Sequence, residues 1–116
     1  MAHITTTVYL NHAEGHLLGF NLCSPARLHQ AANFYLELVD GAPADLAVRG
    51  ALEIVFEQLN IDHPQHAWAQ HYRLAGHRSL CVGDVVVLAE TAWACAPIGW
   101  TPVTAGELRA AIVVTR

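Results

Sequence analysis

The sequence predicts a small α+β domain in which a mostly antiparallel sheet packs against one main helix at about 45–59, with one or two shorter helices. Three observations lead to this fold class. The chain has 116 residues, of which 53% are hydrophobic, which is enough for one core and leaves little room for a second domain. Runs of β-branched and aromatic residues recur along it. One stretch places apolar residues at helical spacing. We therefore expect a single domain over 1–116.

The first third of the chain predicts two strands and a short helix. Residues 4–10 contain three threonines followed by valine and tyrosine, which favour a strand. A turn is expected at 12–15, and the apolar stretch 16–23 is expected to return as a second strand. Ser24 and Pro25 have the form of a helix cap followed by proline at the first helical position. They predict a short helix from 25 to about 33.

The middle of the chain contains the clearest helix. Residues 34–40 favour a strand, which Gly41, Ala42 and Pro43 end. Asp45 can cap the helix that follows, Asn60 can close it, and Pro64 prevents its continuation. Gly50 inside it costs about 1 kcal/mol relative to alanine, so we expect packing to compensate. The apolar residues at helical spacing are Val48, Leu52, Val55, Phe56 and Leu59.

The last third predicts further strands and a capped helix. Residues 61–77 are the least regular, and 79–88 favour a strand or a tight strand pair. Residues 92–103 favour a returning strand with a bend at Pro97 and Gly99. Thr104 and Glu107 have the spacing of a capping box, which would start a helix at Ala105. The alternative is that residues 112–114 end the chain as a strand.

Charge and cysteine content limit the possible partners. Six arginines, no lysine and ten acidic residues give a net charge of −4, which argues against binding to nucleic acid. No apolar run approaches the roughly 20 residues that a membrane span needs. No signal peptide is recognisable at the N-terminus. The three cysteines, at positions 23, 81 and 95, are odd in number and widely spaced, so reduced, buried thiols in a cytoplasmic protein are expected.

Three consecutive segments together resemble the YodL-like domain family. They are 52–64 (LEIVFEQLNIDHP), 76–88 (GHRSLCVGDVVVL) and 92–100 (AWACAPIGW), and the preceding 34–40 also fits. Cys81 and Gly83 stand where the family usually has serine, and the loop 64–76 is longer than usual. The family is widespread in bacteria, phages and plasmids and has no agreed enzymatic activity. The resemblance therefore implies a fold and a genomic neighbourhood, and it implies no reaction.

Four histidines suggest a metal site as an alternative. His63, His66, His71 and His77 lie close together in sequence, with Cys81 nearby. Zinc needs three or four such ligands, but the spacing matches no standard finger or HExxH signature. The simpler interpretation is that they are loop histidines, and a pH-dependent interface is a further possibility. We therefore assign no metal and no cofactor.

No catalytic constellation is recognisable. Ser79 and Cys81 are candidate nucleophiles, but neither lies in a GxSxG elbow or beside an evident base. Asp84 follows a glycine and precedes a valine run, so its carboxylate must be paired or exposed, and we expect it to accept bonds from backbone amides. Arg78 and Asp84 could instead mark a polar recognition spot on a rigid element.

The sequence therefore predicts a protein-binding module. Aromatic and arginine side chains in loops or short helices are typical interface anchors. The predicted partner-binding residues are Trp68, Tyr72, Arg73, His77, Arg78 and Asp84. With the resemblance, this indicates a module encoded by a phage, plasmid or bacterial host that modulates or inhibits a host protein, such as a defence component. The alternatives are a metal-dependent hydrolase or nuclease using the histidines of 63–77, and a homodimer or larger homo-oligomer formed through an apolar edge strand.

Overall fold

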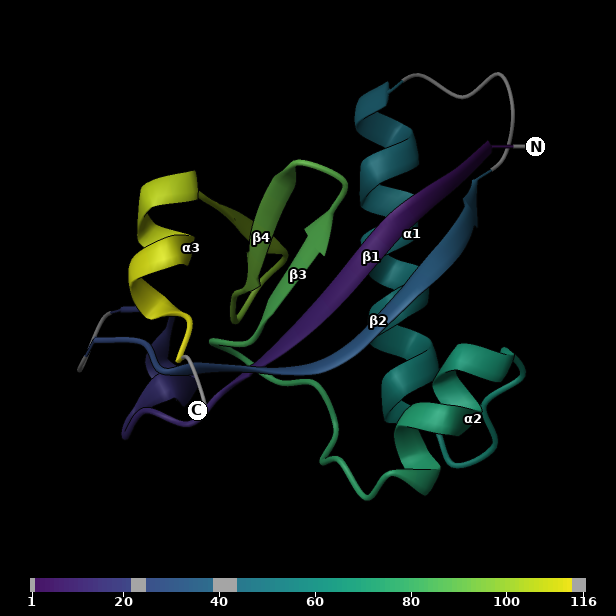
Figure 1. Cartoon of the computed structure of the whole chain (residues 1–116), viewed down its shortest axis with the longest axis horizontal. Helices are drawn as coiled ribbons and strands as arrows, with labels where there is room; N and C mark the ends of the chain where they lie inside the picture. The colour runs from purple at the N-terminus through teal and green to yellow at the C-terminus, as the bar shows by residue number, and fades with distance from the viewer. Residues whose placement is uncertain (1, 22–24, 39–43, 114–116) are drawn as a thin grey trace.

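The computed structural model describes residues 2–21, 25–38 and 44–113, and it has the predicted α+β fold (Figure 1). Within these residues five strands form one antiparallel sheet with three α-helices and one short 3-10 helix. The strands are β1 (Ala2–Asn11), β2 (Leu28–Leu38), β3 (Val85–Leu88), β4 (Thr91–Cys95) and β5 (Trp100–Val103). The helices are η1 (His16–Leu18), α1 (Ala44–Asn60), α2 (Ala67–Leu74) and α3 (Ala105–Ala111).

The sheet has the order β2-β1-β3-β4-β5, so the first strand of the chain lies between β2 and the β3–β4–β5 part of the sheet. β1 pairs with β2 along its whole length and with β3 over four residues. A bulge between Val8 and Tyr9 shifts the register against β2. Such bulges bend a strand and change which side chains share a face. The part of β1 beyond the bulge ends at Asn11, opposite Leu28.

One face of the sheet packs against α1 and α2. In Figure 1 α1 lies behind the long β1 and β2 strands, with α2 at its lower end. Alternate residues of β1 and β3, among them Val8, Val86 and Leu88, point to this face and meet α1. From α1, Leu52, Val55 and Leu59 are buried against them, and Val48 and Phe56 are partly buried at the edge of the same cluster. The helical periodicity of 45–59 is thus confirmed.

The opposite face carries a smaller core that α3 covers. Val85, Ala92 and Val103 lie there with Leu28, and Ala111 and Leu108 of α3 pack onto them. The predicted capping box is confirmed: the Thr104 hydroxyl accepts the Glu107 amide at 3.1 Å, and the Glu107 carboxylate accepts the Thr104 amide at 3.0 Å. After α3, Ile112 forms an isolated parallel bridge to Leu28, and Val114 lies outside the described residues.

Two predictions for the first third of the chain are wrong. The described residues of 25–33 form no helix, because β2 begins at Leu28 and pairs with β1. The described part of 16–23 is a 3-10 turn and an irregular segment rather than a strand. Gly15 and Gly19 flank that turn with φ of 71° and 144°, conformations that favour glycine and break an extended strand. Residues 22–24, including Cys23, lie outside the described residues, as do 39–43 with their predicted strand end.

Two further predictions need correction. In 79–88 only β3 is a strand, since 79–84 turn back on themselves. Residues 92–103 form two strands, with the expected bend at 96–99 closed by the Ala96 amide on the Gly99 carbonyl. No close contact requires glycine at position 50, because a Cβ there would meet nothing within 4 Å. No helix in the described parts of the chain has both the length and the hydropathy to cross a membrane.

Candidate functional site

Asp84 is the centre of a buried hydrogen-bond network. It lies directly before β3 and its side chain is completely buried. One carboxylate oxygen accepts the Asn11 amide and Arg78 Nη2, each at 2.8 Å, and the other accepts the Cys81 amide at 2.8 Å and Arg78 Nη1 at 2.7 Å. The prediction that Asp84 accepts backbone amides is therefore confirmed. A buried carboxylate with four donors, two of them charged, is fully satisfied.

Arg78 joins this carboxylate to the end of β1. Its Nη2 also donates to the Asn11 carbonyl at 2.9 Å, and its Nη1 lies 3.1 Å from the Ser79 carbonyl and 3.0 Å from the Cys81 sulfur. The bonds to Asp84 raise the pKa of the Arg78 guanidinium. From the other side, the buried Tyr72 hydroxyl of α2 donates to the Arg78 carbonyl. Arg78 is thus held through both its guanidinium and its backbone carbonyl, while its side chain stays 38% exposed.

The loop 78–84 that carries both residues is anchored at two further points. Asn60, the last residue of α1, donates its side-chain amide to the Leu80 carbonyl at 2.9 Å and accepts the Leu80 amide at 2.7 Å. The Asn60 side chain therefore reaches across to the loop. At the other end, the Gly83 amide donates to Cys95, and Gly83 accepts the Asn11 side-chain amide.

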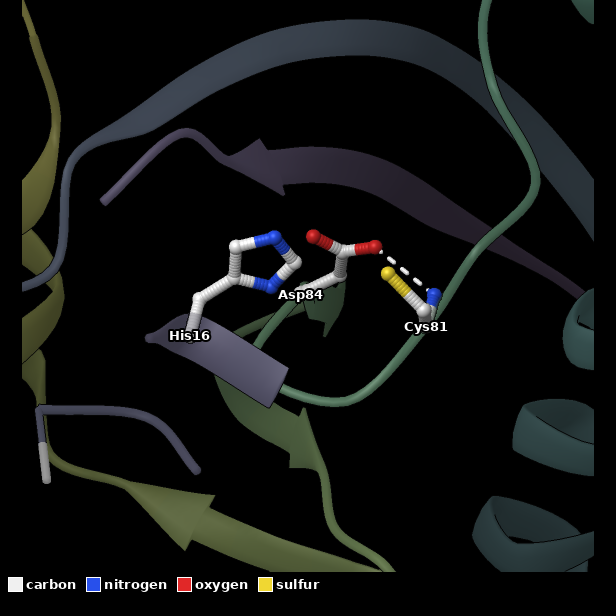
Figure 2. A group of neighbouring side chains, drawn as sticks. All are labelled: His16, Cys81 and Asp84. Atoms are coloured by element: carbon white, nitrogen blue, oxygen red, sulfur yellow. Dashed lines mark hydrogen bonds between the residues drawn. The ribbon is translucent and has the colours of Figure 1, made fainter. Parts of the chain in front are cut away.

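Among the residues that the structure describes, one group has the composition of a metal site: His16, Cys81 and Asp84 (Figure 2). One ligand atom of each lies within 4.8 Å of the others. The carboxylate is already engaged, because Arg78 donates to both of its oxygens, and Arg78 Nη1 also lies 3.0 Å from the Cys81 sulfur. His16 Nδ1 lies 2.9 Å from the Val82 carbonyl, which leaves Nε2 as the ring nitrogen that could bind an ion. A guanidinium cation thus already pairs with the one charged ligand of the group, and these residues fit a metal ion poorly.

The four histidines predicted as metal ligands do not belong to this group. His66 stacks on Trp68 with ring centroids 5.2 Å apart, and His77 lies 4.9 Å from the Tyr72 ring. His63 and His71 are exposed. These four side chains, all among the described residues, therefore form no group of three or more metal ligands.

The protonated state of Cys81 leads to a prediction about its reactivity. Burial and the neighbouring Asp84 charge raise the pKa of this partly exposed thiol to about 11. At pH 8 only about one molecule in a thousand then carries the thiolate, roughly a hundredfold less than an unperturbed cysteine. We expect iodoacetamide to modify Cys81 about a hundredfold more slowly in the native chain than in urea, measured by mass spectrometry of the labelled peptides. Equal rates in the two states would contradict this.

The structure separates the six predicted partner-binding residues into two kinds. Tyr72 and Asp84 are buried, and with Arg78 they form the network above. Arg73 is exposed but donates to the Ile61 carbonyl at 2.8 Å and lies 3.6 Å from Asp62. Trp68 and His77 are partly buried, and the Trp68 ring stacks on Phe34 at 4.3 Å with nearly parallel planes. Only part of the set therefore presents side chains to a partner.

An apolar surface lies away from the predicted partner-binding residues, between α1 and the β4–β5 hairpin. It encloses a cavity of about 620 Å³, which we call the α1–hairpin groove. Its residues come from one side of α1 (Val48, Arg49, Leu52 and Glu53) and from the hairpin (Trp93, Ile98 and Trp100). Trp100 is fixed in place, because its indole nitrogen donates to Glu53 at 3.2 Å and its ring meets Phe56 edge-on at 6.3 Å.

Sequence reasoning missed this groove. Trp93 packs partly against the main cluster, and it also forms a wall of the groove. Ile98, at the tip of the hairpin, is 94% exposed. An isoleucine at a turn beside two tryptophans is the signal that could have located the site, because turns usually carry polar residues.

No family model, curated protein or solved structure matches this chain. The YodL-like resemblance of 52–64, 76–88 and 92–100 therefore stays a prediction.

Proposed function

We propose that this chain is a small protein-binding module that holds a segment of another protein in the α1–hairpin groove. The observation that carries this proposal is Ile98, an isoleucine that is 94% exposed at the rim of an apolar cavity. Its side chain contributes almost nothing to the core of the chain. Exposed apolar groups gathered around a hollow typically mark binding sites.

The composition of the groove favours a protein segment over a small molecule. Small-molecule sites usually place a few polar groups inside an apolar pocket. Here the interior is formed by Leu52, Trp93 and Trp100, while the charged residues Arg49 and Glu53 are exposed. An apolar centre with a polar rim and tryptophan anchors is the usual composition of a protein interface.

The edge of the sheet beside the groove favours docking of side chains over addition of a strand. β5 is the last strand on this side, and it contains Pro102 opposite Trp93. Proline has no N–H to donate to a further strand, so it interrupts a ladder along this edge. The same feature weighs against the homo-oligomer alternative at this edge of the sheet.

The wider context comes from the resemblance alone. We propose that the partner is a bacterial or phage protein, and that binding modulates or inhibits it, as expected for a YodL-like module of a mobile element or its host. A defence component is one such partner. The buried network around Asp84 supports the groove only by holding the hairpin and the end of β1 in place.

Two matched variants test the proposal. Ile98→Glu places a charge at the rim of the groove, and Leu74→Glu places one on a leucine that is 87% exposed at the end of α2. Both changes should alter the free energy of unfolding by less than about 0.5 kcal/mol, because the side chains are solvated. In capture from a bacterial lysate, we expect a partner to be retained by the wild type and Leu74→Glu and reduced at least tenfold with Ile98→Glu. Equal retention by Ile98→Glu would contradict the proposal.

A further inference from the structure

We infer that the segment bound in the α1–hairpin groove carries a bulky apolar residue with an acidic residue close to it in sequence. This inference rests on the proposed function and specifies the chemistry of the partner. It follows from two properties of the groove. The first is its apolar floor with two tryptophan walls, and the second is that the two charged side chains on its rim differ in whether they already have a hydrogen-bond partner.

The apolar part of the groove selects the anchor residue. Leu52 is 1% exposed and forms the floor, while Trp93 and Trp100 are half-buried and form walls. The bond from Trp100 to Glu53 and the edge-on contact with Phe56 hold one wall in a fixed orientation. A large aliphatic or aromatic side chain would bury the most apolar area here and pack against the ring faces.

The two rim charges, both from α1, are not equivalent. Glu53 already accepts a hydrogen bond from the Trp100 indole. Arg49 is exposed and makes no hydrogen bond or ion pair with any residue that the structure describes. The guanidinium of Arg49 is therefore available to a partner, whereas one oxygen of the Glu53 carboxylate already accepts the Trp100 indole. A partner carboxylate beside Arg49 would gain charge-assisted, bidentate hydrogen bonds.

The overall charge of the chain does not favour an acidic partner. The net charge of −4 repels an acidic partner at long range. An acidic residue in the bound segment must therefore be recognised locally, at Arg49. Since like charges near an interface suppress wrong partners, a basic residue at the same place would lose the Arg49 contact and meet repulsion instead.

The test is a selection from a library of random 12-residue peptides displayed on yeast, with the full chain as the bait. With the wild-type chain we expect enrichment of peptides that combine a bulky apolar residue with Asp or Glu. These peptides should be retained by Leu74→Glu and lost by Ile98→Glu. With Arg49→Glu as the bait, the enriched peptides should carry Lys or Arg in place of the acid. For one synthetic peptide, replacing the acid by its amide should weaken binding roughly fivefold to the wild type and leave binding to Arg49→Glu unchanged or stronger.

The outcomes separate this inference from the proposed function. Peptides that depend on Ile98 but show no acidic enrichment, and no change with Arg49→Glu, overturn the inference and leave the binding groove intact. Peptides that bind Ile98→Glu as well as the wild type overturn the proposed groove itself. A library that gives no peptide above background with the wild-type bait overturns both.

Discussion

Replacing Asp84 by asparagine is expected to lower the free energy of unfolding by about 3–5 kcal/mol, a large part of the stability of a domain of this size. Each carboxylate oxygen accepts one backbone amide and one guanidinium N–H. An asparagine has the same shape but replaces one acceptor oxygen by an NH₂ group. The side chain at position 84 is 0% exposed and has donors beside both of its terminal atoms, so the NH₂ group would face other donors with no acceptor. The substitution would also remove the negative charge that pairs with Arg78.

The matched control is Glu90→Gln, the same chemical change at an exposed position in the turn between β3 and β4. Urea denaturation followed by tryptophan fluorescence gives the free energy of unfolding of both variants. The control should lie within about 0.5 kcal/mol of the wild type. If Asp84→Asn were as stable as its control, the carboxylate could not be the centre of the network that we describe.

Replacing Gly83 by alanine is expected to lower the free energy of unfolding by about 2–4 kcal/mol. Two effects contribute, a left-handed backbone conformation and a steric overlap of the new Cβ with neighbouring backbone. Gly83 has φ of 93°, where a Cβ is disfavoured. A Cβ at this position would lie 2.4 Å from the backbone oxygen of His16. Backbone cannot move aside as the end of a flexible side chain can, so η1 or the turn before β3 must shift.

A second glycine provides a control of opposite sign. Gly50 lies inside α1 with open space around the position of a Cβ. Gly50→Ala should therefore stabilise the chain by up to about 1 kcal/mol, the difference in helix propensity. Thermal unfolding by circular dichroism compares the two variants directly. A Gly83→Ala variant that melts at or above the wild-type temperature would show that the turn tolerates a side chain.

The parts of the fold that the sequence predicted are those with a strong local signal. The spacing of Leu52, Val55 and Leu59 identified α1, and the pair Thr104 and Glu107 identified the start of α3. The residues before β2 were misread because Ser24-Pro25 is a local helix signal, whereas Leu28 is placed by pairing with Asn11 of β1. Pairing between strands distant in sequence outweighs local propensity, and a single sequence does not reveal it.

The same distinction explains what was predicted of the site. That Asp84 must be paired followed from its place beside a valine run, but its partners come from β1 and from a loop, so they could not be named in advance. Arg78 was expected to face a partner because arginine is common at interfaces, yet its donors point inward to Asp84 and Asn11. The groove depends on how α1 crosses the β4–β5 hairpin, an arrangement that no spacing along the chain encodes.

The anchoring of loop 78–84 determines how the native state opens. Although it contains no helix or strand, the loop is tied to α1 through Asn60, to α2 through Tyr72 and to β1 through Asn11. Local opening of the loop would break all three ties at once, so its opening is coupled to separation of those elements. Its Leu80 and Cys81 amides should therefore exchange with solvent as slowly as those of the sheet, and the loop forms one cooperative unit with the core.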